Sequence, residues 1–201
     1  MTTLERIPSQ DVNYYYDGNP FSSSYSSNTW GRLAAVQFYD QAPSQDPMTF
    51  TYQYNYNQAG RVTGNRTLVT NGSEITMMDL NASYAWDNQG KMTQMTYPVA
   101  NGPNAPTGPT FNYTYDAMNR LNGMTETFWS YGQNQQWFQS TASQAFASNV
   151  TYNAAGQMTS MLIDSYASES RSYNNLMQLT GINGPGVNVA YNYASSAEFV
   201  G

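Results

Sequence analysis

Tyr56-Asn57-Gln58-Ala59-Gly60-Arg61-Val62-Thr63 is an octet that recurs along this chain of 201 residues. It begins with an aromatic residue and an Asp or Asn, reaches glycine after two variable residues, and continues with a basic, an aliphatic and a small residue. Further copies occupy residues 86–93, 115–122 and 152–159, and a weaker copy occupies 173–180. Such self-similarity indicates a repeat architecture. It also favours a structural unit over an active site, which is usually built once.

A split copy precedes these octets and spans about residues 14–34. It opens at Tyr14-Tyr15-Tyr16-Asp17 and is completed by Gly31-Arg32-Leu33 after a Ser-rich insert at 21–29. Glycines at 31, 60 and 90 are therefore spaced by roughly thirty residues, as expected when each unit contains two or three strands.

The octet itself predicts the turn of a β-hairpin. Its Asp or Asn can bond the nearby backbone, and its glycine supplies the positive φ of a type I turn followed by a G1 bulge. Asn119 replaces glycine in the third copy and suits the same conformation. Met177 does not suit it, so we expect that turn to differ. The residues to which we assign a structural role in the turns are Tyr16, Asp17, Gly31, Arg32, Tyr56, Gly60, Arg61, Trp86, Asp87, Gly90, Lys91, Tyr115, Asp116, Asn119, Arg120, Tyr152, Gly156 and Tyr173.

Strict alternation of aromatic and polar residues precedes several octets. Phe50, Tyr52, Tyr54 and Tyr56 occupy every second position, with Thr, Gln and Asn between them. A period of two places the aromatic rings on one face of a strand and leaves a polar face free to meet water or a polar partner. Because no segment shows a helical stripe, the sequence predicts an all-β protein of repeated antiparallel hairpins in a spiralling sheet.

The composition excludes several classes of protein. The net charge is −6 with seven scattered cations, which cannot form the basic face of a nucleic-acid-binding protein. The chain has no Cys and no His, so it lacks the thiolate nucleophiles, histidine bases and zinc ligands of many enzymes. No apolar run is long enough to span a bilayer, and no signal peptide is visible. We expect no cofactor and no bound metal.

The octets resemble the YD repeat of the Rhs family, which reads approximately Tyr-Asp-x-x-Gly-Arg-Leu-Thr. The resemblance runs from about Tyr14 to Tyr193 and includes the tail Tyr191-Asn192-Tyr193-Ala194, which is similar to the opening of another unit. It implies a β-sheet that spirals strand by strand, often closing into a hollow shell. In bacterial Rhs and toxin-complex proteins the shell encloses a toxic domain, and in teneurins a similar shell belongs to an adhesion ectodomain. This chain lacks the aspartate-based self-cleavage site and any toxin domain.

Three groups of side chains are candidates for chemistry or binding. The basic positions Arg32, Arg61, Lys91 and Arg120 are read as structural, stacking on a neighbouring Tyr or pairing with a turn Asp, although a ladder for an acidic glycan is the alternative. The carboxylates Asp17, Asp87 and Asp116 occur once per unit, which fits turns better than a catalytic pair. The tryptophans outside the octets, which are the best candidates for stacking on a sugar, are Trp30, Trp129 and Trp137.

These observations predict one YD-repeat β domain over 1–201, with inserts at 21–29 and 100–109 and with strand and turn between Tyr131 and Gln144. The expected function is that of a non-enzymatic structural scaffold resembling a bacterial shell wall, extracellular or at the cell surface. Open sheet edges would let copies self-associate into a fibre. The alternatives are an extracellular glycan- or receptor-binding module and a toxin-encapsulating segment of a longer shell.

Overall fold

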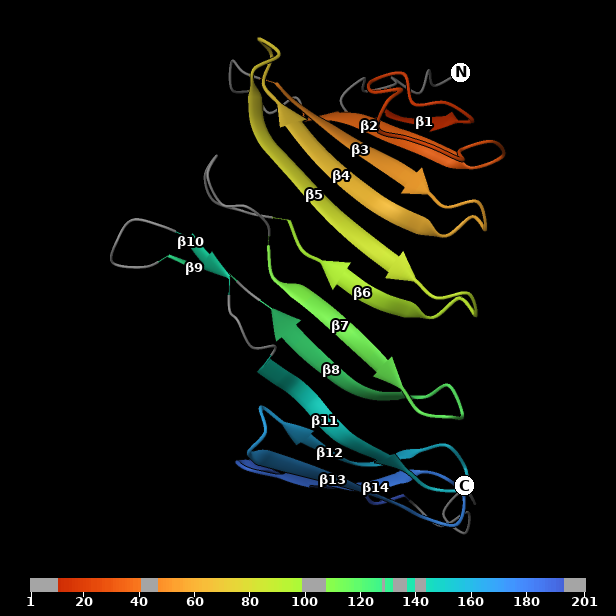
Figure 1. Ribbon diagram of the computed structural model, residues 1–201, viewed down its shortest axis with the longest axis vertical. Helices are drawn as coiled ribbons and strands as arrows, with labels where there is room; N and C mark the ends of the chain where they lie inside the picture. Colours follow the sequence, from red (N-terminus) through yellow and green to blue (C-terminus); the bar gives the residue numbers. More distant parts are fainter. Residues whose placement is uncertain are drawn as a thin grey trace, which may run out of the picture. The chain divides into compact units, whose positions relative to one another are not determined.

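The computed structural model describes residues 11–40, 47–98, 108–127, 129–131, 137–139 and 144–193, and within these ranges it contains strands and turns but no helix. The prediction of an all-β protein built from antiparallel hairpins is confirmed (Figure 1). The insert at 100–109 falls almost wholly outside the described residues.

The chain divides into two compact units. Unit 1 comprises residues 1–110 and 128–139, and unit 2 comprises residues 111–127 and 140–201. Each is a meander in which the strands of its main sheet pair antiparallel with their neighbours in chain order. The organisation of residues 1–201 as a single domain stays a prediction.

Unit 1 contains one sheet of long strands and one small hairpin. The sheet consists of β1 (Val12–Tyr16), β2 (Leu33–Asp40), β3 (Met48–Tyr56), β4 (Val62–Thr70), β5 (Thr76–Trp86) and β6 (Met92–Thr96). A separate hairpin pairs β9 (Trp129–Tyr131) with β10 (Trp137–Gln139). Strand β10 lies within Tyr131–Gln144, where the sequence predicts strand and turn, and residues 132–136 and 140–143 of that segment lie outside the described residues.

Unit 2 continues the same pattern with shorter strands. They are β7 (Thr110–Tyr115), whose first residue belongs to unit 1, β8 (Leu121–Thr127), β11 (Gln144–Tyr152), β12 (Met158–Ile163), β13 (Ala167–Tyr173), β14 (Leu179–Gly184) and β15 (Val187–Ala190). Strand β11 pairs with β8 on one side and β12 on the other. The remaining strands follow in chain order.

One face of the unit 1 sheet carries the alternating aromatic residues. Phe38 lies opposite Phe50 in the β2–β3 register, and their rings stack with centroids 5.0 Å apart and planes 6° from parallel. The Tyr52 ring packs diagonally on Phe38 at 5.9 Å. Contacts of this kind are the main stabilising unit of a sheet, so these rings serve packing between strands.

The Ser-rich insert covers part of the polar face of this sheet. Asn19 donates a hydrogen bond from Nδ2 to Oε1 of Gln53 at 3.0 Å, and the Gln53 side chain is only 1% exposed. The backbone N–H of Ser27 donates to Oδ1 of Asn55 at 3.0 Å. The polar partner of this face in the β3 region is therefore a segment of the same chain, and the buried polar groups are paired, as burial requires.

Candidate functional site

The octet turn is a compact five-residue structure fixed by its Asp or Asn. In the octet at 56–63, Asn57 N–H donates to the Arg61 carbonyl at 2.9 Å, and Gly60 N–H donates to the Asn57 carbonyl at 2.9 Å. Oδ1 of Asn57 accepts the Arg61 N–H at 3.0 Å. Gly60 has a φ of 81°, and the ladder shifts register beside Tyr56, which together define a type I turn with a G1 bulge.

The other four complete octets form the same turn. In each of them, the N–H of the first turn residue donates to the carbonyl of the residue in the basic position, and the fourth turn residue has a positive φ. These fourth residues are Gly90 (89°), Asn119 (64°), Gly156 (77°) and Met177 (62°). Within each unit the octet turns lie at the same end of the strands (Figure 1).

The prediction that the turn at Met177 differs is wrong. Asn174 accepts hydrogen bonds from the N–H groups of Leu176 at 2.9 Å and Gln178 at 3.0 Å. Asp87, Asp116 and Asn153 accept the same pair of bonds in their own turns. The bonds to Asn174 hold Met177 in the left-handed region although a side chain there costs about 1–2 kcal/mol. The turn is therefore specified by its Asx residue more strongly than by its glycine.

The split copy keeps the closing bond of the octet around its insert. Asp17 N–H donates to the Arg32 carbonyl at 3.1 Å, and Gly31 has a φ of 69°. The Arg32 N–H donates at 2.8 Å to the carbonyl of Thr29, a residue of the insert. The insert therefore replaces the two variable residues of the octet without opening the hairpin.

The aromatic residue also joins its copy to the preceding one in the octets at 56–63, 86–93, 152–159 and 173–180. The Tyr56 hydroxyl donates to the carbonyl of Leu33, the aliphatic residue of the preceding copy, at 2.7 Å, and Trp86 Nε1 donates to Val62 at 2.7 Å. The same bond runs from Tyr152 to Leu121, Tyr173 to Met158 and Tyr193 to Leu179, at 2.6, 2.8 and 2.8 Å. Tyr193 thus makes the contact of a further repeat. The sequence analysis does not predict this bond. Its only signal in the sequence is that an aromatic first position in one copy always follows an aliphatic seventh position in the copy before it.

The basic position makes a second contact between copies. The Arg32 guanidinium lies 5.8 Å from the Tyr56 ring centroid and against Gly60, where an added Cβ would approach its Nη2 to 2.7 Å. Arg120 lies 4.4 Å from the Tyr152 ring centroid. Glycine at this position thus has two roles: it adopts the positive φ, and it leaves room for the arginine of the preceding copy.

Lysine and glutamine in the basic position make related contacts. Lys91 pairs with Asp87 of its own turn at 3.4 Å, as Arg120 pairs with Asp116 at 2.7 Å. Gln157 donates from Nε2 to the carbonyl of Met177 at 2.7 Å, which joins the fourth complete octet to the next turn without a charge.

The carboxylates of Asp87 and Asp116 are held ionised by their own loops. Hydrogen bonding from the Lys91 backbone N–H lowers the pKa of Asp87, and the Arg120 backbone N–H lowers that of Asp116 in the same way, with the side-chain cation adding to each. Across the part of the chain that the structure describes, no group of three or more acidic residues could hold a metal ion. Each of these two carboxylates serves its own turn.

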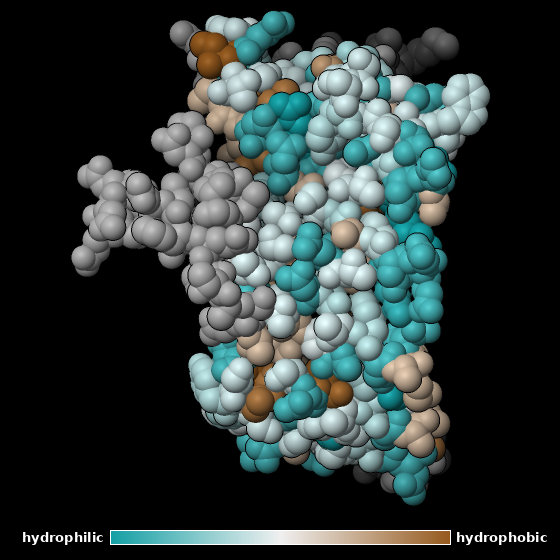
Figure 2. Space-filling view, viewed as in Figure 1, coloured by the Kyte–Doolittle hydropathy of each residue, from teal (hydrophilic) through white to brown (hydrophobic). Residues whose placement is uncertain are grey.

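The tryptophans proposed for sugar stacking lie in different places. Trp30 is at the end of the insert and is 84% exposed. Trp129 and Trp137 begin strands β9 and β10, but their side chains lie outside the described residues. On the face drawn in Figure 2, hydrophobic surface is confined to small patches among polar residues.

Comparison with known proteins supports the fold alone. No protein-family profile and no curated protein matches the chain. Crystal structures of TcdB2-TccC3 do match. The structure lacking the hypervariable C-terminal region has a TM-score of 0.55 at 13% identity, over 91% of this chain and 10% of that one. The TcdB2-TccC3-Cdc42 structure has a TM-score of 0.54 at 13% identity, with the same coverage. The chain spans about a tenth of the length of these neighbours.

None of the described segments forms a helix that could cross a lipid bilayer.

Proposed function

We propose that this chain is a non-enzymatic structural scaffold, a length of β-repeat wall whose repeats can be continued by further copies. The observation that carries the proposal is the bond that Tyr56, Trp86, Tyr152, Tyr173 and Tyr193 each donate to a carbonyl of the preceding copy. This bond, together with the contact of the basic position, joins neighbouring repeats at one end of their strands. Repeat proteins gain stability from such nearest-neighbour contacts, and they can be extended by the same rule.

The first strand of unit 1 and the last strand of unit 2 support association at the edges. Val12, Tyr14 and Tyr16 of β1 are 44, 60 and 60% exposed. In unit 2, Val187 and Val189 of β15 are 49 and 37% exposed. Within the described residues each of these strands pairs on one side only. An exposed apolar edge strand is a template for another strand, so we propose that copies self-associate there, at a cell surface or outside the cell.

Sedimentation velocity over a wide concentration range, with negative-stain imaging, tests this proposal. We expect association that grows with concentration. Replacing Tyr14 and Val189 by Lys should abolish it, because charged side chains block edge pairing. Tyr166→Lys is the matched control, because Tyr166 is 81% exposed in a turn away from either edge strand. A wild-type chain that stays monomeric throughout would refute self-association.

A second candidate is a segment of a toxin-encapsulating shell, and the similarity in fold to TcdB2-TccC3 favours it. In that case the wall would continue in the reading frame that encodes this chain. Sequencing that frame tests the candidate: further octets followed by an unrelated C-terminal domain would support it, and a frame without further octets would contradict it.

A further inference from the structure

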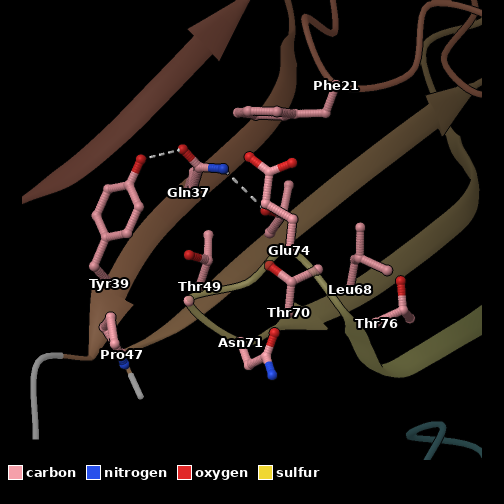
Figure 3. Close-up of a pocket in the computed structure, with 12 residues that line it drawn as sticks. Phe21, Gln37, Tyr39, Pro47, Thr49, Leu68, Thr70, Asn71, Glu74 and Thr76 are labelled. Carbon is pink, nitrogen blue, oxygen red and sulfur yellow. Dashed lines mark hydrogen bonds between the residues drawn. The ribbon is translucent and has the colours of Figure 1, made fainter. Parts of the chain in front are cut away.

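A polar pocket of about 620 Å³ lies on the face of the unit 1 sheet opposite its aromatic rows. Strands β2, β3, β4 and β5, the β4–β5 turn and the insert all contribute to its lining (Figure 3). Its size falls within the range of small-molecule sites. None of the residues in the octet turns lines it, so it is separate from the contacts between repeats.

The wall of the pocket is ordered by its own hydrogen bonds. The Tyr39 hydroxyl donates to Oε1 of Gln37 at 2.7 Å, and Nε2 of Gln37 donates to Oγ1 of Thr51 at 3.2 Å (Figure 3). Phe21 from the insert faces this wall across the pocket, and its ring is held edge-on against Tyr15 with centroids 5.1 Å apart. The pocket therefore combines a fixed aromatic ring with a fixed polar wall.

The floor of the pocket presents polar groups without a partner among the described residues. Thr49 on β3 lies opposite Thr70 on β4, which lies opposite Thr76 on β5, so three hydroxyls line neighbouring strands. Among the described residues these hydroxyls and the Glu74 carboxylate have no hydrogen-bond or ion-pair partner. Unused hydroxyl and carboxylate groups beside an aromatic ring are what a polyhydroxylated ligand requires.

Glu74 lies at a backbone position with a positive φ, which is strained for a residue with a side chain. The turn does not require this strain, because glycine would adopt the same φ without it. Residues 71–75 form the same turn as the octets: Asn71 N–H donates to the Ile75 carbonyl at 3.0 Å, and Glu74 N–H donates to the Asn71 carbonyl at 2.9 Å. Glu74 takes the place of glycine, with a φ of 59°. Backbone strain of this kind is concentrated at functional sites. Here it directs Glu74, the only acidic residue among the described residues of the lining, into the pocket.

We propose that this pocket binds an amino sugar within a short oligosaccharide. The apolar face of the sugar ring packs on Phe21, its hydroxyls bond to the threonines, and its ammonium group pairs with Glu74. The described residues of the lining include no Lys or Arg, and the chain carries a net charge of −6, so acidic sugars are disfavoured. The site differs from the exposed tryptophans considered above and lies within a single unit. Its occupancy is therefore independent of whether copies associate.

Titrations monitored by backbone amide NMR shifts test the ligand class. The probes are the β-1,4-linked trisaccharides of glucosamine and glucose and a trisaccharide of galacturonic acid. We expect the glucosamine trimer to shift the amides of residues 49, 70, 71 and 74 and to bind about fivefold more tightly than the glucose trimer, as an exposed ion pair allows. The uronic acid trimer should not bind. No binding of the glucosamine trimer, or equal binding of all three, would overturn the proposal.

Two variants of Glu74 separate binding from folding. E74Q keeps the shape and should lower the affinity for the glucosamine trimer to that for the glucose trimer. E74G should raise Tm by roughly 2 to 4 °C, since about 1 kcal/mol of strain is released. It should also lower the affinity for the glucosamine trimer at least as much as E74Q does. M177G is the matched control, because it releases strain in a turn of the same type in unit 2, outside the pocket, and should leave affinity unchanged. If E74Q and E74G bind the glucosamine trimer as the wild type does, the assignment of Glu74 fails.

Discussion

The hydroxyl of Tyr56 is the donor that ties its octet to the split copy, and removing it tests the repeat contact directly. Tyr56→Phe deletes the 2.7 Å bond to the Leu33 carbonyl and keeps the ring that packs beside Arg32. A net hydrogen bond contributes about 1 kcal/mol, which for a chain of this length corresponds to a decrease of roughly 2 to 4 °C in Tm. Tyr173→Phe deletes the 2.8 Å bond to Met158 in unit 2 and should cost a similar amount.

Urea unfolding followed by circular dichroism measures these losses. Tyr166→Phe is the control, because this side chain is 81% exposed and its hydroxyl has no hydrogen-bond partner among the described residues. The two losses should add in the double variant, because the sites share no partner. If Tyr56→Phe and Tyr173→Phe are no less stable than Tyr166→Phe, the aromatic-to-carbonyl bond does not hold neighbouring repeats together.

Three further predictions concern the turns and the insert. Met177→Gly should raise the free energy of unfolding by about 1 kcal/mol, because glycine adopts a positive φ without strain; a loss of stability in urea titrations would refute this. The depressed pKa values of Asp87 and Asp116 stabilise the fold above their ordinary range near pH 4, and this stability is lost as pH falls through the lowered values. Replacing both by Asn, which forms the same turn in other copies, should therefore flatten the decline of urea midpoints in acid, and an unchanged acid profile would contradict the assignment. Burial raises the pKa of the Tyr25 hydroxyl in the insert to about 12, so folding favours its neutral form and stability should fall as pH rises from about 10 to 12. Tyr25→Phe should reduce that alkaline loss in thermal melts, and an equal loss would exclude Tyr25 as a source.

Much of the fold follows from local chemistry that sequence reasoning can read. The alternation at Phe50, Tyr52 and Tyr54 places these rings on one face, and the octet glycines at 60, 90 and 156 fall in turns with positive φ. Such features depend on neighbours within a few residues. They therefore leave a clear period in the sequence.

What sequence reasoning missed depends on contacts between distant segments. Nothing near Asn19 indicates that it bonds Gln53, 34 residues away. The 71–75 turn escaped notice because Glu74 stands where the octet has glycine. The prediction for Met177 is wrong for a related reason. Residue preference at one position matters less than the Asx hydrogen bonds that fix the whole loop. The pocket was invisible because its residues come from four strands and the insert.

The concentration of inter-repeat bonds at one end of the strands has a consequence for how such a chain can vary. Within each unit, the opposite end carries connections of unequal length, such as residues 71–75 between β4 and β5 and residues 164–166 between β12 and β13. Those connections are free of the ties that set the repeat, so they can lengthen or accept foreign segments with little penalty to folding. We expect sequence differences between related chains to be concentrated in these connections, and a peptide epitope could be grafted there.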